Sequence, residues 1–402
     1  MFRMSAYKRI YDTIVSSHLE SERQMIFLSG PRQIGKTTIC EAFATDYLNW
    51  DDDDDKLRIL AGQKAVAQGL GLEIADKARK VVAFDEIHRY RRWKLFLKGF
   101  FDVYGKKTKI IVTGSARMDV YKRGGDSLMG RYFPYRMHPF SVAELLDVSL
   151  PERPVRVPRP LPETEWNALL EFGGFPEPFV RRNAAFSARW HRLRTEQLIR
   201  GDVRDMSEIV ALDQMAALAR ILQERSGEQI VFDSLARDVK VSENTVKSWV
   251  STLCALHYGF LVRPYHRHVA EAIRKTPKWF LRDWSRIKDE GKRNETFMAC
   301  HLLKAVEGWT DLGLGEFDLF YVRDKKKREV DFLVTRDDKP WFAVEVKTSD
   351  SKISENLRWV KDRIGVDHAF QVVMAMPYQD VDVFREREPV CVSARTFCSQ
   401  LL

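Results

Sequence analysis

The chain has 402 residues, of which 45% are hydrophobic and 31% are charged, and this size favours two or three domains over a single core. No apolar run is long enough to span a bilayer, which argues against an integral membrane protein, so we predict no membrane association and a cytoplasmic location. The formal net charge of +9 favours an acidic partner, with nucleic acid the first candidate. The cysteines are scattered without metal-ligand spacing, so we expect reduced thiols and no zinc.

The first predicted element is an amphipathic helix, because the opening residues have periodic charge and lack the long apolar segment of a signal peptide. A short apolar β-run, Met25–Leu28, then enters a loop of the form Gly-x4-Gly-Lys-Thr, and helix-compatible residues follow. This strand–loop–helix order predicts a P-loop. The residues expected to contact the nucleotide are Gly30, Pro31, Arg32, Gln33, Ile34, Gly35, Lys36, Thr37 and Thr38.

Each residue type in this loop has a chemical role. Gly30 and Gly35 allow backbone conformations closed to other residues, so that successive N–H groups can point at phosphate oxygens. Lys36 brings a positive charge to the β and γ phosphates, while the Thr37 hydroxyl can bind Mg²⁺. The positive end of the following helix faces the same anion. We therefore predict that the chain binds ATP together with Mg²⁺.

Short apolar runs alternate with helical patterns over the first 150 residues, which is typical of a parallel sheet with helices on both faces. The expected strands are residues 25–29, 47–50, 81–84, 109–113 and 132–138. Ligands of such sheets bind at the carboxyl ends of the strands. The acidic run Asp51–Asp55 follows the second strand and is interpreted as a solvated loop.

Further candidate residues lie at or beyond the ends of the later strands. Asp85 can hold the water shell of Mg²⁺, and Glu86 can polarise the attacking water as a general base. Ser115 could position the same water or sense the γ-phosphate, but an ordinary strand-end turn explains it equally well. Arg131 is a candidate arginine finger, acting in cis or on a neighbouring subunit, although a single arginine in a basic chain is more often a surface residue.

The middle of the chain has a different pattern. The proline-rich segment Pro151–Pro162 predicts an extended linker, and helical patterns at 165–172 and 185–206 predict a helical lid. From residue 229, two short helices and a strand pair follow the order of a winged helix. The basic residues expected on its recognition helix and wing are Lys247, Arg263, His266, Arg267, His268, Arg274, Lys275 and Lys278. Contact with the DNA backbone is favoured over sequence-specific reading, and a spacer or a protein contact is the alternative.

The last part of the chain alternates a helix, three strands, a helix and a strand. Asp331 and Glu345 fall on neighbouring strands, and Glu295 lies on the preceding helix. Lys347 follows Glu345 by two residues, so both side chains lie on one face of their strand. We predict that Glu295, Asp331 and Glu345 bind Mg²⁺ or Mn²⁺ and that Lys347 orients an attacking water. The alternative is an ion pair on the polar face of two strands.

The motifs GPRQIGKTT, VVAFDEIH and IIVTGSA resemble those of the AAA superfamily. Together with GRYFPYRMHPFSVAEL, KTPKWFLRD and EVDFLV followed by FAVEVK, they make the chain similar to a widespread prokaryotic family of ATP-binding proteins. The resemblance implies an α/β protein with a P-loop AAA-type ATPase domain at 1–150, a linker and helical lid at 151–228, a winged helix at 229–284, and a restriction-endonuclease-like PD-(D/E)xK domain at 285–402. It also implies that a homo-oligomer can form through the ATPase domain, although no second arginine sensor of the kind found in hexameric AAA machines is identified.

These observations lead us to expect an ATPase coupled to a metal-dependent DNA nuclease-like domain. Its catalytic residues would be Glu86, Arg131, Asp331, Glu345 and Lys347. The alternative is a nucleotide-driven switch whose C-terminal domain binds nucleic acid or protein without cleavage, and a third hypothesis is a transcription regulator that uses the winged helix. Cleavage requires Asp331, whereas a binding module should tolerate its loss.

Overall fold

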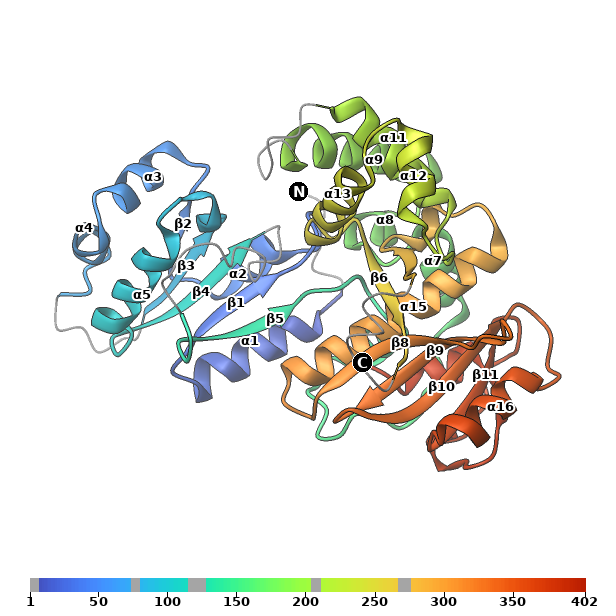
Figure 1. Cartoon of the computed structure of the whole chain (residues 1–402). Coiled ribbons are helices and arrows are strands. Elements are labelled where there is room, and N and C mark those ends of the chain that lie inside the picture. The colour runs from blue at the N-terminus through green and yellow to red at the C-terminus, as the bar shows by residue number, and fades with distance from the viewer. Residues whose placement is uncertain (1–6, 74–79, 115–127, 204–210, 267–275) are drawn as a thin grey trace. The chain divides into compact units, whose positions relative to one another are not determined.

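The computed structural model describes residues 7–73, 80–114, 128–203, 211–266 and 276–402. Its contacts divide the chain into two compact units (Figure 1). Of the described residues, those within 7–138 and 148–150 form the P-loop unit, and those within 139–147 and 151–402 form the C-terminal unit. Among the described residues, no helix combines the length and apolar character needed to cross a membrane.

A five-stranded parallel sheet organises the P-loop unit, with the strand order β2-β3-β4-β1-β5. This sheet confirms the α/β class expected for this part of the chain. The strands are β1 (Met25–Ser29), β2 (Asp46–Asn49), β3 (Lys80–Asp85), β4 (Thr108–Gly114) and β5 (Tyr132–Arg136). The helices are α1 (Ile10–Ser21), α2 (Lys36–Phe43), α3 (Asp53–Leu60), α4 (Gln63–Gly69) and α5 (Trp93–Tyr104).

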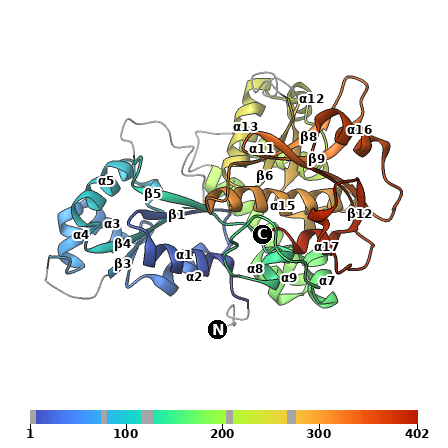
Figure 2. The ribbon, with the colours of Figure 1, turned by 90° about the horizontal axis from the view of Figure 1, so that it is seen from below.

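Helices cover both faces of this sheet, and alternating apolar side chains explain why. Phe84 on β3 and Val112 on β4 belong to the hydrophobic core that α3, α4 and α5 share with one face of the sheet. Their neighbours Ala83 and Ile111 point to the opposite face and are fully buried too. Figure 2 shows α1 and α2 on the side of the sheet away from α5. Burial on both faces accounts for the continuous apolar runs in these strands.

The acidic run after β2 begins a helix, so the expectation of a solvated loop is wrong. The Asp52 side chain accepts hydrogen bonds from the backbone N–H groups of Asp54 and Asp55, both at 3.1 Å, and thereby caps α3. The following aspartates lie in the first turn of the helix, where the positive end of the helix dipole stabilises negative charge. Charge alone therefore does not make this segment a loop.

A seven-stranded mixed sheet organises the C-terminal unit, with the order β12-β11-β10-β9-β8-β6-β7. The strands are β6 (Gly259–Pro264), β7 (Lys278–Leu281), β8 (Phe317–Arg323), β9 (Glu329–Arg336), β10 (Lys339–Lys347), β11 (His368–Val373) and β12 (Val390–Ser393). The helices are α6 (Val142–Leu146), α7 (Glu163–Phe172), α8 (Pro176–Arg181), α9 (Ala184–Gln197), α11 (Leu212–Glu224), α12 (Phe232–Val239), α13 (Glu243–Ala255), α15 (Glu290–Asp311), α16 (Glu355–Ile364) and α17 (Ala394–Ser399). Strands β8, β9 and β10 pair in antiparallel fashion, whereas β11 pairs in parallel with β10.

The strand pair after α13 continues this sheet. β6 and β7 form the expected antiparallel pair, and β6 also pairs in parallel with β8 through Arg263 and Phe320. Helix α15 packs against β7, β8, β9 and β10. Helix α16 packs through Leu357 and Val360 into a core that includes Leu333 of β9. The predicted boundary at residues 284–285 therefore falls between elements that share one sheet.

The chain passes from the P-loop unit to the C-terminal unit at His138, earlier than the expected boundary at residue 150. Residues 139–147 belong to the C-terminal unit, where the Phe140 N–H donates to the Gly174 carbonyl at 2.7 Å. The proline-rich segment 151–162 is irregular, as expected, but it too lies within this unit. There the Arg156 N–H donates to the Gln400 carbonyl at 2.9 Å, and the Arg156 guanidinium pairs with Asp147 at 3.3 Å.

Candidate functional site

The loop between β1 and α2 has the geometry of a phosphate cradle. Gly35 has φ +105°, a left-handed conformation that favours glycine, and Lys36 begins the helix immediately after it. A Cβ atom on Gly30 would lie 2.7 Å from the Met137 carbonyl oxygen, so this close approach of two backbones excludes a side chain. The Lys36 ammonium donates to the carbonyl oxygens of Gly30 and Pro31, both at 2.9 Å. The positive charge is therefore held inside the loop.

Lys36 is buried, with 7% of its surface exposed. Burial lowers the pKa of its ammonium to about 8, even though the nearby Glu86 and Asp85 carboxylates act in the opposite direction. Phosphate oxygens in the loop would add negative charge beside the ammonium and favour its protonated form. Nucleotide binding and protonation of Lys36 should therefore strengthen each other.

We expect ATP to bind more weakly as the pH rises above the pKa of Lys36. Because the protonated ammonium attracts phosphate, the Kd for ATP should be flat near pH 7 and rise by up to about tenfold per pH unit beyond about pH 8. Titration with a fluorescent ATP analogue at several pH values measures this. Lys36→Arg keeps its charge throughout and should give a flat profile. A wild-type Kd that stays constant across the same range would contradict the assignment.

Asp85 lies beside the loop at the end of β3 and accepts hydrogen bonds from three hydroxyl groups. Thr37 Oγ1 donates to Asp85 Oδ2 at 3.2 Å, and Tyr47 and Thr113 also donate to this carboxylate. Asp85 itself is 6% exposed. The structure therefore brings the two predicted Mg²⁺ ligands of the P-loop unit, Thr37 and Asp85, into contact. Tyr47 and Thr113 were not among the predicted site residues, although their positions on the strands flanking β3 could have identified them.

Glu86 follows Asp85 with φ 53°, a left-handed conformation that is uncommon for a residue with a side chain. Its Oε2 lies 3.6 Å from His88 Nε2. Burial raises the pKa of Glu86, while the Lys36 ammonium opposes this rise. A raised pKa brings a carboxylate closer to the range in which it accepts a proton from water efficiently. Burial also lowers the pKa of His88 to about 4, so its imidazole is neutral near pH 7.

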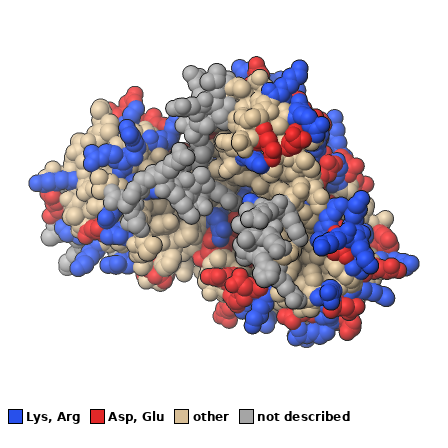
Figure 3. Space-filling view, viewed as in Figure 1, with Lys and Arg blue, Asp and Glu red and all other residues tan. Residues whose placement is uncertain are grey.

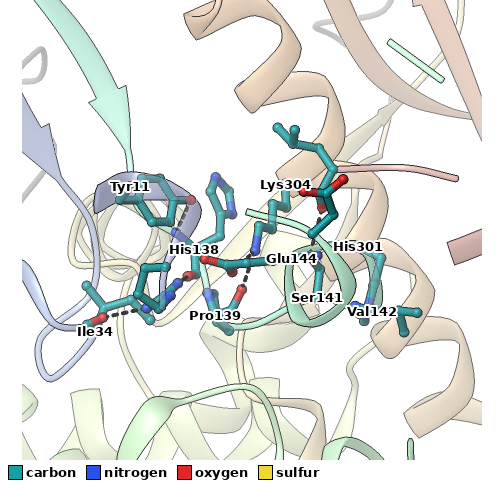
Figure 4. Close-up of polar contacts among 12 residues, drawn as sticks. Tyr11, Ile34, His138, Pro139, Ser141, Val142, Glu144, His301 and Lys304 are labelled. Carbon is teal, nitrogen blue, oxygen red and sulfur yellow. Dashed lines mark hydrogen bonds and ion pairs between the residues drawn. The ribbon is translucent and has the colours of Figure 1, made fainter. Parts of the chain in front are cut away.

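Arg9, the residue before α1, holds the P-loop backbone in place through hydrogen bonds. Its guanidinium donates from Nη1 to the Ile34 carbonyl at 2.9 Å and from Nη2 to the His138 carbonyl at 2.6 Å (Figure 4). The Tyr11 hydroxyl accepts from the His138 N–H at 2.8 Å and donates to the Arg136 carbonyl at 3.0 Å. Arg9 thus ties the P-loop backbone to the segment that follows β5. It lies far from the P-loop in sequence and belongs to no motif, so sequence analysis did not identify it.

We expect Arg9→Ala to weaken ATP binding by roughly tenfold, because two buried carbonyl groups lose charge-assisted hydrogen bonds worth about 1.5–3 kcal/mol each. Arg9→Lys should recover part of the affinity, since a lysine cannot reproduce the planar fork. Arg58→Ala removes an exposed arginine of α3 and serves as the matched control. Equal ATP affinity in wild type and folded Arg9→Ala, measured with the fluorescent analogue, would show that Arg9 does not support the loop.

Two of the three predicted metal ligands of the C-terminal unit, Glu295 and Asp331, lie around a lysine. Lys278, the first residue of β7, is 3% exposed. Its Nζ lies 2.9 Å from Glu295 Oε1, 2.7 Å from Glu329 Oε1 and 3.8 Å from Asp331 Oδ1. The predicted place of Lys278 on a DNA-binding wing is therefore wrong, because its side chain points into this acidic cluster. Glu329 was missed, although its spacing of two residues from Asp331 places both on one face of β9.

Glu345 and Lys347 form an ion pair on β10, the strand next to β9. Lys347 Nζ lies 2.7 Å from Glu345 Oε1, whereas the buried Glu345 Oε2 has no hydrogen-bond partner among the described residues. Asp331 Oδ2 accepts from the backbone N–H of Val346 at 2.8 Å, so both strands contribute to the same region. Within the described part of the chain, no group of three or more His, Cys, Asp or Glu residues is arranged to hold a metal ion.

The acidic cluster consists of Glu295, Glu329 and Asp331, and the charges of these carboxylates and of Lys278 shift one another's pKa values. Burial raises the pKa of Glu295 to about 7, and the nearby Asp331 carboxylate adds to this effect, while Lys278 opposes it. Burial likewise raises the pKa of Asp331. For Lys278, burial acts to lower the pKa, but attraction to Glu295, Asp331 and Glu329 outweighs burial and raises it. Lys278 therefore stays protonated near pH 7.

Residues 22–146 match a family model described as an AAA domain. The P-loop unit contains an AAA-type ATPase domain. Such a domain implies ATP and usually Mg²⁺. Residues 163–286 and 290–390 match two models described as domains of unknown function, DUF8612 and DUF4143. These two models assign no activity to the C-terminal unit.

Relatives of the whole chain are distant. Uncharacterized proteins of Mycobacterium bovis and Mycobacterium tuberculosis are each 21% identical over 345 residues, covering 83% of this chain and 73% of theirs. An uncharacterized protein of Methanocaldococcus jannaschii is 23% identical over 305 residues, covering 66% of this chain and 62% of its own. Among solved structures, AMPPCP-bound DnaA of Aquifex aeolicus matches with TM-score 0.28 and 14% identity, covering 60% of this chain and 85% of DnaA. PCH-2 of C. elegans matches with TM-score 0.23 and 15% identity, covering 60% and 65%. TM-scores this low support no inference.

Arg131 lies at the opposite end of the AAA domain's sheet from the P-loop. Its Nε and Nη2 donate to the two carboxylate oxygens of Asp102, at 2.8 and 3.0 Å, and its carbonyl accepts from the N–H of Met25, the first residue of β1. Because the P-loop follows the other end of β1, about 16 Å of extended strand separates them. The cis form of the arginine-finger prediction is therefore wrong, and action on a neighbouring subunit stays a prediction.

Two further groups of predicted residues can be located in the chain. Five lie in the loop or the first turn of α2, and their contacts with nucleotide stay a prediction: Pro31, Arg32, Gln33, Ile34 and Thr38. Others lie outside the described residues: Ser115, and four basic residues of the expected wing, Arg267, His268, Arg274 and Lys275. On the face drawn in Figure 3, basic side chains are interspersed with acidic ones on each unit. The net charge of +9 is thus not gathered into one continuous basic surface on this face.

Proposed function

We propose that the AAA domain binds ATP with Mg²⁺ and hydrolyses it. The observation that carries this proposal is the contact between Thr37 and Asp85, at 3.2 Å, directly beside a P-loop that encloses the Lys36 ammonium. A hydroxyl and a carboxylate are the oxygen ligands that suit Mg²⁺, so these residues fit the metal that the domain implies. When bound, Mg²⁺ would neutralise charge on the β and γ phosphates.

In the proposed hydrolysis, each residue around the P-loop has a distinct role. Lys36 holds the β and γ phosphates, and the loop N–H groups orient them. Glu86 takes the proton of the attacking water as general base, and Tyr47 and Thr113 keep the Asp85 carboxylate fixed in orientation through their hydrogen bonds. Arg131 of a neighbouring chain in a homo-oligomer would supply charge to the transition state, and Ser115 would sense the γ-phosphate.

We further propose that the nucleotide state controls a C-terminal unit that acts on DNA. Support comes from the basic net charge and from the order of α12, α13, β6 and β7, which matches that of a winged helix. The position of Lys278 favours DNA binding without cleavage, because its ammonium forms ion pairs with carboxylates that a metal ion would need as ligands. Metal-dependent cleavage with Mg²⁺ or Mn²⁺ is the second candidate, favoured by the unpartnered Glu345 Oε2 beside Lys347.

Fluorescence anisotropy of a labelled DNA duplex tests this control. We expect wild-type affinity for DNA to differ by about tenfold between the ADP state and the state with a non-hydrolysable ATP analogue, within the usual range of coupling between two sites. Lys36→Ala should bind DNA with one affinity in all nucleotide conditions. Equal DNA affinity of the wild type in every nucleotide state, or no DNA binding in any of them, would contradict the proposed control.

A further inference from the structure

The acidic cluster of the C-terminal unit differs from the metal site that its sequence predicts. Glu295, Glu329 and Asp331 all face Lys278 Nζ, which lies within 2.9 Å of the first two and at 3.8 Å from the third. The lysine comes from β7, in a part of the chain that the sequence assigns to a different domain. Side chains from β7, α15 and β9 therefore meet around a buried lysine, with the three carboxylates partly exposed.

The ammonium occupies the position that a divalent cation would need. Each carboxylate oxygen that contacts Lys278 is already committed to a strong, charge-assisted hydrogen bond or a close ion pair. Mg²⁺ binds oxygen at about 2.0–2.1 Å in near-ideal octahedral geometry, so it cannot share these oxygens with an ammonium at the same place. With Lys278 in place, Glu295 and Asp331 do not fit the predicted metal.

A second observation concerns the strand beside the cluster. Glu345 is 6% exposed, and its Oε2 is buried without a hydrogen-bond partner among the described residues. Its other oxygen is paired with Lys347 at 2.7 Å. The site thus keeps one buried carboxylate oxygen that has no hydrogen-bond partner among the described residues, beside carboxylates that already contact a lysine.

We propose that Lys278 is the resident cation of this site, excludes divalent metal from it, and leaves the C-terminal unit as a binding domain that does not cleave DNA by metal catalysis. This inference deepens the proposed function and rests on it for the role of the C-terminal unit. The cluster then has a structural role, because it ties β7, at the edge of the sheet, to α15 and β9. Binding of DNA or of another partner would take place without any metal requirement at this unit.

Binding of Mn²⁺ to nucleotide-free protein, followed by electron paramagnetic resonance, tests the inference. Wild type and Asp331→Asn should bind the same amount of Mn²⁺, because the cluster already holds its cation. Lys278→Met should gain one Mn²⁺ per chain with affinity at least about tenfold above any wild-type binding, and Lys278→Met with Asp331→Asn should lose it again. Lys304→Met removes another buried lysine, which pairs with Glu144 outside the acidic cluster, and should gain no Mn²⁺.

Removal of Lys278 leaves three carboxylates close together, so the protein could unfold. The double variant Lys278→Met with Glu329→Gln restores the original charge balance and should also gain Mn²⁺, with a rise in Tm when the metal is added. Mn²⁺ bound to wild type but lost in Asp331→Asn would overturn the inference, as would a folded Lys278→Met that gains none. ATP turnover and DNA affinity are measured separately on the same proteins, so failure of the proposed function would be distinguishable.

Discussion

Glu86→Gln is expected to bind ATP as well as wild type and to hydrolyse it between about 10²- and 10⁴-fold more slowly, the usual contribution of a positioned general base. Glutamine has nearly the same shape as glutamate but cannot accept the proton of the attacking water. The substitution also removes a negative charge near the Lys36 ammonium, so ATP affinity should not fall. Single-turnover release of phosphate measures hydrolysis, and the fluorescent ATP analogue measures binding.

The control for this experiment is Glu41→Gln, which makes the same chemical change at an exposed position of α2. It should hydrolyse ATP at the wild-type rate. Lys36→Ala provides the complementary case, because it should lose nucleotide binding as well as hydrolysis. If Glu86→Gln turned ATP over as fast as wild type, Glu86 would not be the general base, and another group near Asp85 would have to take that role.

Removing one partner of the buried ion pair between Glu144 and Lys304 is expected to destabilise the C-terminal unit by about 3–5 kcal/mol, because the remaining charge stays buried without its ion-pair partner. The side chains of Glu144 and Lys304 are 0% and 2% exposed. Lys304 Nζ also donates to the Pro139 carbonyl at 3.1 Å, and the adjacent Val142 N–H donates to His301 Nε2 at 3.2 Å (Figure 4). The pair thus anchors residues 139–147 to α15.

Thermal and urea unfolding of Lys304→Met measures this loss of stability. Lys304→Met combined with Glu144→Leu should recover much of it, since a well-packed apolar pair often replaces a buried ion pair without cost. Lys247→Met breaks an exposed pair with Glu243 on α13 and should cost less than about 1 kcal/mol. If Lys304→Met unfolded at the same urea concentration as Lys247→Met, the buried pair would not be the anchor of this segment.

Local motifs explain why much of the AAA domain could be predicted from the sequence. The P-loop is a continuous stretch, and each apolar run that ends near a functional residue became a strand of the parallel sheet. Asp85 and Thr37 meet because parallel strands present their carboxyl ends at the same edge of the sheet. The α-helix at Asp53–Leu60 was missed because its aspartates cap a helix as readily as they solvate a loop.

The contacts that sequence analysis could not provide are those between distant parts of the chain. Lys278 was taken for a surface cation because it stands among basic residues, whereas the sheet turns it toward carboxylates on α15 and β9. Arg131 looked like a finger because it follows a glycine near the end of the AAA domain, yet it lies at the amino end of β5. In both cases the surroundings of the side chain depend on contacts between distant parts of the chain. A single sequence does not reveal these contacts.

We propose that this protein is an ATPase whose C-terminal unit does not cleave DNA by metal catalysis. ATP turnover in Mg²⁺, measured with supercoiled DNA in the same reaction and repeated in Mn²⁺, tests it most directly. We predict turnover by wild type, none by Lys36→Ala, and intact DNA throughout. Turnover that persists in Lys36→Ala, or DNA cleavage by wild type that is lost in Asp331→Ala, would contradict the claim.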